Sequence, residues 1–314
     1  MNSSHPTRHS WLIKISLVIL FLSAFSALLL WLFTGMLATM ASEVPPPARP
    51  AIRSEFLPFP SEQHHIPSLD GTRIAFRYFP TSSDPRLPVL FIVHGFGASK
   101  EHMLTYMLFA QKNGYPSVGI DLRGHGDSDP ALCSFGYREK QDVLAVAQWL
   151  NQKGHPRYVL WGTSMGAVTS ALTAETQPQG LQGLILDAPF DTLRNTLVHH
   201  AKVFFNLPEF PFFPLTFWQI ERTVGYDTRQ INVPRALQSI HQPLLILAAE
   251  NDERMPLPMV RGLYDLAHSP KTLHIIPGAD HEYRAFDPEF QEAVLTFLRR
   301  LPDLDPSPAT HNNP

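Results

Sequence analysis

Seven short apolar runs follow one another along the chain after residue 70, and helical patterns separate several of them. They are Arg73 to Phe79, Val89 to His94, Ser117 to Asp121, Tyr158 to Trp161, Gly183 to Asp187, Leu244 to Ala248 and Thr272 to Ile276. Several runs are continuously apolar rather than alternating, which is typical of parallel strands buried on both faces. The pattern predicts an α/β fold around a mostly parallel sheet.

Composition and charge narrow the class of protein. The chain has 314 residues, of which 44% are hydrophobic, so it can bury one large core. A net charge of −3 provides no basic surface for nucleic acid, which we exclude as a partner. The single cysteine, Cys133, excludes an internal disulfide framework. No cluster of His and Cys has the spacing of a zinc site, so we expect no metal.

An almost wholly apolar stretch extends from Trp11 to Phe33 and carries one charge, Lys14, near its start. As a helix it would be about 34 Å long, which is enough to cross the hydrocarbon of a bilayer. The first positive charge after it is Arg49, so we expect the N-terminus in the cytoplasm and the rest of the chain on the outer side. A cleaved signal peptide is the alternative, because Ala38 and Ala41 offer small residues for cleavage.

These patterns divide the chain into segments. Residues 1–10 are expected to be cytoplasmic, and residues 11–38 to form a transmembrane signal anchor. Residues 39–62 are rich in proline and are expected to form an extended linker. Residues 63–302 are expected to form one folded domain, followed by a disordered tail at 303–314.

Residues Gly162 to Gly166 read Gly-Thr-Ser-Met-Gly and match the pattern G-x-S-x-G. In that pattern the serine occupies a strained turn between a strand and a helix, where side chains at the glycine positions would collide with the backbone. An apolar run precedes the turn, and a helical segment rich in small residues follows it. Ser164 is therefore predicted to be a catalytic nucleophile.

A serine nucleophile needs a base and an orienting carboxylate, which on this kind of sheet follow it in the order acid, then histidine. Asp252 and His281 each come shortly after the end of a predicted strand, downstream of Ser164. Ligands bind beyond the carboxyl ends of such strands. We predict Asp252 as the orienting acid and His281 as the general base, with Asp187 and Glu250 as the competing acids.

The segment Phe91 to Ser99 is a predicted strand that opens into a turn containing glycine. A tetrahedral intermediate needs two N–H donors aimed at its oxyanion, one from the residue after the nucleophile and one from this loop. The backbone N–H groups of Met165 and Phe96 are the predicted donors. We interpret His94 as a residue that holds this loop, and we assign His125 no catalytic role.

Six motifs, in this order, resemble the α/β-hydrolase superfamily: HGFGAS, DLRGHGDSD, GTSMG, LDAPFD, PLLILAAENDERMP and PGADHEY. The segment Gly136 to Glu139 with Asp142 is similar to membrane-anchored α/β-hydrolase-domain proteins and to bacterial relatives of the dienelactone-hydrolase type. The resemblance implies an eight-stranded, mostly parallel sheet with helices on both faces, and it implies the same five site residues. Ala167 departs from the family, in which many members have a second glycine after the elbow.

Residues 196–234 lie where this fold inserts a cap, and they are unusually aromatic. They include Phe204, Phe205, Phe210, Phe212, Phe213, Phe217 and Trp218. These side chains could line an acyl-chain pocket, touch the bilayer beside the anchor, or form the core of the cap itself. All three interpretations remain open at this point.

The sequence thus predicts a membrane-anchored serine hydrolase that cleaves carboxylic esters or thioesters through an acyl-enzyme, with no cofactor. A lipid-like substrate such as a lysophospholipid or a monoacylglycerol is the leading candidate, by analogy and from the aromatic segment. A serine peptidase or amidase of the same fold is one alternative. A catalytically silent scaffold that binds a ligand or partner at the membrane is the other.

Overall fold

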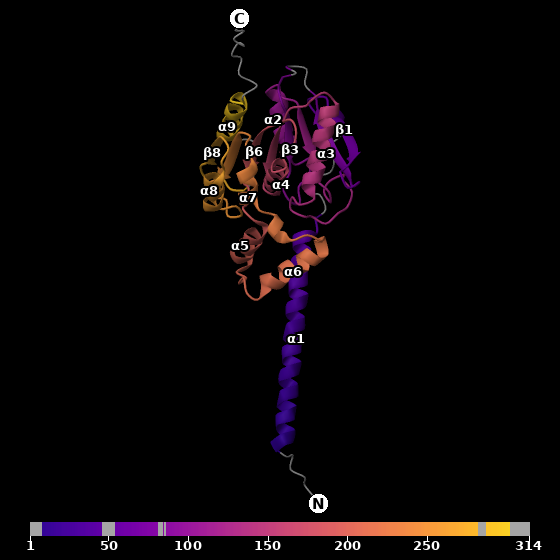
Figure 1. The fold of residues 1–314 in the computed structure, drawn as a ribbon, viewed down its shortest axis with the longest axis vertical. Helices are drawn as coiled ribbons and strands as arrows, with labels where there is room; N and C mark the ends of the chain where they lie inside the picture. The colour runs from indigo at the N-terminus through magenta and orange to yellow at the C-terminus, as the bar shows by residue number, and fades with distance from the viewer. Residues whose placement is uncertain (1–7, 46–53, 81–83, 85, 282–286, 302–314) are drawn as a thin grey trace, which may run out of the picture.

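All seven apolar runs form strands of one sheet in the computed structural model, which describes residues 8–45, 54–80, 84, 86–281 and 287–301 (Figure 1). The expected tail at 303–314 lies outside these residues. The strands are β1 (Glu62–Pro67), β2 (Arg73–Phe79), β3 (Val89–Val93), β4 (Ser117–Ile120), β5 (Tyr158–Thr163), β6 (Leu181–Asp187), β7 (Leu244–Ala249) and β8 (Lys271–Ile276). The predicted α/β fold with an eight-stranded sheet is confirmed.

The order of the strands across the sheet is β1-β2-β4-β3-β5-β6-β7-β8. Strand β2 is antiparallel to β1 and to β4, and every other neighbouring pair is parallel. The sheet is therefore mixed at one edge and mostly parallel, as expected. The carboxyl ends of β3, β5, β6, β7 and β8 all reach the same edge, where ligands bind in sheets of this kind.

Strand β1 is the one strand that the apolar runs did not predict. Its sequence, Glu-Gln-His-His-Ile-Pro, is mostly polar, and none of its residues is fully buried. It pairs only with β2, at the edge of the sheet. An edge strand needs no continuous apolar run, because water covers much of it.

Helices cover both faces of the sheet. Alternate residues of a strand serve opposite faces: Phe91 and Val93 of β3 belong to one core, and Leu90 and Ile92 to the other. The first core includes residues of α3 (Glu139–Gln152), α4 (Met165–Ala174), α7 (Val233–Ser239) and α8 (Leu257–Leu266). The second core includes residues of α2 (Leu104–Lys112) and α9 (Pro288–Arg299). Because both faces are covered, central strands such as β3 and β7 are apolar throughout.

One long helix, α1 (Arg8–Ser42), projects from the domain (Figure 1). Among the described residues it is the one helix long and apolar enough to cross a membrane, and its most apolar part has no protein packed around it. The helix ends at Ser42, four residues beyond the segment expected to span the bilayer. Its C-terminal end enters the domain, where Ala38 is almost fully buried.

The cap lies between β6 and β7, at the end of the domain from which α1 projects (Figure 1). It comprises α5 (Leu193–Phe205), α6 (Phe212–Val224) and the short 3-10 helix η2 (Thr228–Gln230). A second 3-10 helix, η1 (Ser54–Phe56), precedes β1. The Thr192 side chain caps α5 by accepting the N–H of Asn195, and Gly225 ends α6 in the left-handed conformation.

A buried ion pair fixes the loop after β4 to helix α3. Arg123 donates to the Asp142 carboxylate at 2.6 Å, and both side chains are almost fully buried. Asp142 also accepts the Ser68 hydroxyl, and Arg123 also donates to Asp70 at the surface. The pair therefore joins the β1–β2 turn, the β4 loop and α3 at a single point.

We predict that Arg123→Ala lowers the free energy of unfolding by about 3–5 kcal/mol, because it leaves the buried Asp142 carboxylate without its cation. Denaturant unfolding in mild detergent measures this loss. Arg235→Ala is the matched control: its pair with Glu175 is largely exposed, so its removal should change stability far less. Equal effects of the two substitutions would contradict a structural role for the buried pair.

Candidate active site

Ser164 lies in a sharp turn between β5 and α4, with φ 53° and ψ −118°. A positive φ is rare for a residue with a side chain, and tight packing holds it here. A Cβ on Gly162 would collide with the carbonyl of Gly166, and a Cβ on Gly166 would collide with the carbonyl of Val93. Both glycines of the pattern are therefore required by close backbone contacts, which is the geometry expected of a nucleophile elbow.

The structure brings Asp252 and His281 together. Asp252 lies in the loop after β7 and His281 in the loop after β8, and His281 Nδ1 is 2.7 Å from Asp252 Oδ2. The other carboxylate oxygen, Oδ1, accepts the backbone N–H groups of Arg254 and Met255. The Asp252 side chain is 1% exposed and that of His281 is 14% exposed. A buried, fixed carboxylate thus holds His281 by Nδ1 and leaves Nε2 available.

The two competing acids make other contacts, although Asp187 also lines the cavity that contains Ser164 and His281. Glu250 is exposed, and its carboxylate accepts the N–H of Gly278 at 2.9 Å. Asp187 ends β6, and its backbone carbonyl accepts the N–H of Ser164 at 2.8 Å. The hydrogen bond of His281 Nδ1 to Asp252 therefore favours Asp252 as the orienting acid.

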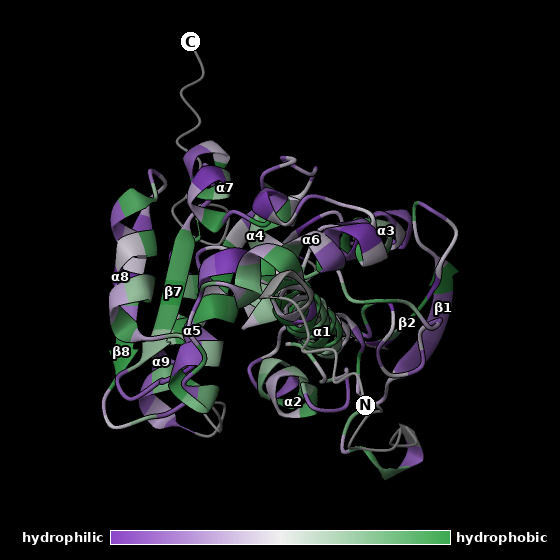
Figure 2. Ribbon diagram, turned by 90° about the horizontal axis from the view of Figure 1, so that it is seen from below, coloured by the Kyte–Doolittle hydropathy of each residue, from purple (hydrophilic) through white to green (hydrophobic). Residues whose placement is uncertain are grey.

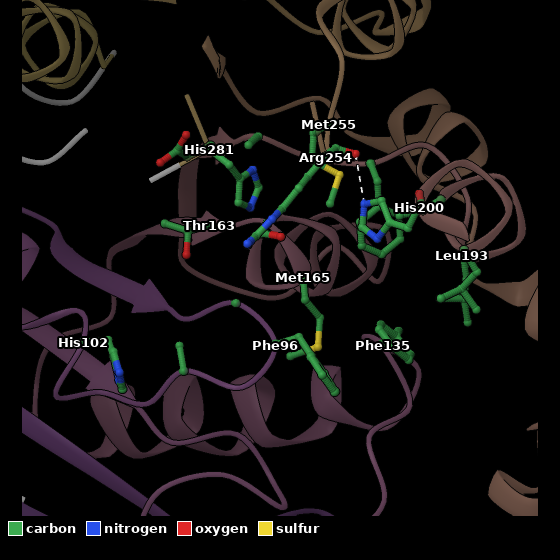
Figure 3. A pocket seen from close by; sticks show the side chains of 18 of the residues that line it. Phe96, His102, Phe135, Thr163, Met165, Leu193, His200, Arg254, Met255 and His281 are labelled. Atoms are coloured by element: carbon green, nitrogen blue, oxygen red, sulfur yellow. Dashed lines mark hydrogen bonds between the residues drawn. The ribbon is translucent and has the colours of Figure 1, made fainter. Parts of the chain in front are cut away.

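Ser164 and His281 line one cavity of about 790 Å³. Figure 3 shows His281 and Arg254 on one side of it, with Phe96, Met165 and Phe135 on the other. Within the described part of the chain, Ser164 Oγ forms no hydrogen bond with His281. Catalytic hydrogen bonds are often long without substrate, so the shared cavity is the informative observation.

The two predicted oxyanion donors lie beside Ser164. Met165 is the first residue of α4, and Phe96 follows Gly95, whose position would bring a Cβ to 3.4 Å from Ser164 Cβ. Neither backbone N–H donates to another group within the described residues. Both are therefore available to an oxyanion above Ser164, and the amino end of α4 adds a favourable dipole.

Two neutral histidines hold the loop that carries Phe96. His94 Nδ1–H donates to the carbonyl of Gly95 and its Nε2 accepts the N–H of Leu122; His125 Nε2 accepts the N–H of Gly97. An imidazole that accepts a hydrogen bond through one nitrogen is in its neutral form, with its proton on the other nitrogen. Burial lowers the pKa of both histidines, and that of His94 falls well below its usual value. These contacts support a structural role for both side chains.

The aromatic side chains of the cap lie in three different surroundings. Phe213 and Phe217 are buried in the core of the cap. Phe204 lines the cavity. Phe205 and Phe210 are 72% and 79% exposed.

The sequence did not predict that α1 contributes to the cavity. Met40 and Ala41, near its end, both line it. The signal in the sequence was the spacing of Thr34, Ala38 and Ser42, which places small residues on one face of a continuing helix. Ala38 is also one of the two small residues, with Ala41, that fit a cleavage site, which is why the pattern was ambiguous. Among the described residues, no group of three or more His, Cys, Asp or Glu side chains could hold a metal ion.

Comparisons with known proteins agree with the fold. The sequence profile of a family described as "alpha/beta hydrolase fold" matches residues 88–234. The uncharacterized protein YqkD of Bacillus subtilis is 27% identical over 243 residues, covering 76% of this chain and 79% of YqkD. Lysophosphatidylserine lipase ABHD12 of Danio rerio is 28% identical over 68% of this chain, which spans 58% of that lipase. The crystallised Pyrococcus furiosus esterase Pf2001 has a similar fold, with TM-score 0.69, 24% identity and coverage of 83% and 98% of the two chains.

We predict that the free energy of unfolding falls as pH decreases below about 6.5, where histidines of the unfolded chain take up protons that His94 and His125 cannot accept when folded. The folded pKa is depressed, so the unfolded state binds more protons and stability rises with pH. Denaturant unfolding between about pH 8 and pH 5 measures the slope. His94→Asn should reduce the slope, and an unchanged slope would contradict the burial of a neutral imidazole.

Proposed function

The chain belongs to the α/β-hydrolase superfamily, and on this premise we propose that it cleaves carboxylic esters or thioesters with Ser164, His281 and Asp252 as a catalytic triad. One observation carries the proposal: His281 is hydrogen-bonded to the buried Asp252 and lines the same cavity as the strained Ser164. The three residues come from three different loops at one edge of the sheet.

In the proposed mechanism, His281 Nε2 takes the hydroxyl proton of Ser164 as its oxygen attacks the acyl carbon. Asp252 keeps the proton on Nδ1 and stabilises the imidazolium that forms. The N–H groups of Phe96 and Met165 hold the oxyanion of the tetrahedral intermediate. The imidazolium then protonates the leaving group, and His281 activates the water that releases the acyl group from Ser164.

The walls of the cavity support an acyl lipid as substrate. Phe190, Leu193 and Leu197 line it together with Phe204, and such surfaces bury hydrocarbon chains favourably. Arg254 also lines it, close to His281 (Figure 3). A guanidinium suits the phosphate of a lysophospholipid better than the uncharged head of a monoacylglycerol. The similarity to a lysophosphatidylserine lipase supports the same class.

We further propose that α1 crosses a membrane, with its N-terminus in the cytoplasm and the hydrolase domain on the outer side. The length and apolar character of α1 support the first statement, and the positive charges before and at its start support the second.

Protease protection of intact membranes tests this orientation. We expect protease added from outside to digest the domain, while the short N-terminal segment resists until the membrane is opened. Digestion of the domain only from the cytoplasmic side would refute the proposed orientation.

A fluorophosphonate probe tests the chemistry. Wild-type protein should be labelled and Ser164→Ala should not. Asp252→Asn should lower the turnover of a p-nitrophenyl ester by roughly 10³–10⁴-fold, because it removes the group that holds the productive tautomer. Glu250→Gln is the matched control, because it changes an exposed carboxylate in the same loop and should leave turnover close to wild type.

The outcomes separate the alternatives. Absence of labelling in the wild-type protein would favour a silent scaffold. Labelling together with cleavage of peptide amides and not of esters would favour a peptidase. A large loss in Asp187→Asn, with Asp252→Asn still active, would move the acid to Asp187.

A further inference from the structure

The end of helix α1 is a wall of the candidate site as well as a connection to it. Thr34, Ala38 and Ser42 lie on one buried face of the helix, at a spacing of four residues. The Ser42 carbonyl accepts the N–H of Cys133 at 2.8 Å, in the loop that precedes α3. Met40 and Ala41 are thereby held beside the cavity that contains Ser164.

The cap is packed against the same helix. Trp31 and Trp218 have ring centroids 5.5 Å apart, and Gln219 donates to the Thr34 hydroxyl at 2.9 Å. A Cβ on Gly35 would lie 2.9 Å from Oε1 of Gln219, so the approach of α6 to α1 is close. Figure 2, seen from below along α1, shows α6 beside it. These contacts fix the position of the cap along the axis of α1, at residues 31–35.

The cap also exposes an apolar rim. The term denotes five exposed side chains of the cap: Val203, Phe204, Phe205, Phe210 and Trp218. Phe204 belongs to both the rim and the cavity wall, so the exposed apolar surface continues into the site. Exposed aromatic clusters of this kind mark contact surfaces.

The length of α1 identifies what covers the rim. Trp11 and Trp31 are 20 residues apart, which is about 30 Å along a helix and matches the hydrocarbon thickness of a bilayer. Most side chains between them are exposed and apolar. If the two tryptophans mark the two interfaces, Trp218 lies at the same depth as Trp31, on the side of the domain, because their rings are in contact. The α5–α6 end of the cap, which carries the rest of the rim, lies at the end of the domain from which α1 projects (Figure 1).

We propose that the rim lies in the bilayer interface and that the cavity opens there, so that a single-chain acyl lipid enters from the membrane between α1 and α5. The chemistry at the end of this route rests on the function proposed above, but the position of the rim does not. Met40 lies nine residues beyond Trp31, about 14 Å further along the axis. A long acyl chain can extend from the interface to that depth in the protein, whereas an acetyl group cannot.

The position of the rim can be measured on the full chain in phosphatidylcholine vesicles. Cys133 is the only cysteine and is buried, so a cysteine at Phe205→Cys can be labelled selectively with an environment-sensitive fluorophore. Leu266→Cys is the matched control: this exposed residue ends α8 near the start of β8, at the sheet edge away from the cavity.

We expect the label at position 205 to shift to shorter wavelength and to be quenched by spin-labelled lipid, and the label at position 266 to show neither effect. Equal responses at the two positions would overturn the proposal. A shift at position 205 without quenching by lipid would also overturn it, since a second copy of the chain would then cover the rim.

Activity supplies a second readout. In the double variant Phe205→Glu/Phe210→Glu, hydrolysis of a long-chain monoacylglycerol in vesicles, divided by that of soluble p-nitrophenyl acetate, should fall about tenfold or more, because two exposed rings that contact lipid in the proposed position become charges. An unchanged ratio would contradict the entrance. Failure of the wild-type protein to cleave either ester would instead contradict the proposed function, leaving the fluorescence result to decide the position of the rim.

Discussion

Gly166 allows helix α4 to rest directly against the carbonyl of Val93, and the geometry of the candidate site depends on this contact. Because no side chain intervenes, the helix begins immediately beyond the sheet, and Ser164 must turn sharply between the two. The same turn makes Met165 the first residue of α4, so that its N–H lies at the amino end of the helix beside the serine. The Phe96 loop also lies close, since a Cβ on Gly95 would be 3.4 Å from Ser164 Cβ. A single backbone contact thus positions the proposed nucleophile and both proposed oxyanion donors.

Much of the fold was predictable because its physical cause is visible along the chain. Strands buried on both faces must be continuously apolar, so β3, β5 and β7 stand out, while the polar edge strand β1 does not. Asp252 and His281 could be chosen because residues that directly follow parallel strands lie at the same edge of the sheet. Their hydrogen bond itself depends on loop conformations that no spacing in the sequence determines.

The sequence could not decide the role of residues whose pattern occurs in several structural environments. An exposed phenylalanine and a buried one have the same letter, so only tertiary packing separates Phe210 from Phe213. Small residues near the end of α1 fit a cleavage site, a linker or a tight helix contact. The contact with α6 and with the Cys133 loop decides how they pack. The spacing of the cap phenylalanines, and that of the small residues in α1, is the same in each of these environments, so periodicity cannot distinguish them.

The contact between Trp31 and Trp218 has a mechanical consequence. A cap packed against a membrane-spanning helix cannot swing outward independently, because its movement would pull an aromatic anchor from the interface. On the proposed topology, the thickness of the surrounding bilayer therefore becomes a structural variable of the enzyme. A thicker membrane draws the cap towards the lipid, and a thinner one tilts the helix and the domain with it. The lipid composition of the host membrane would thus act directly on the mouth of the cavity.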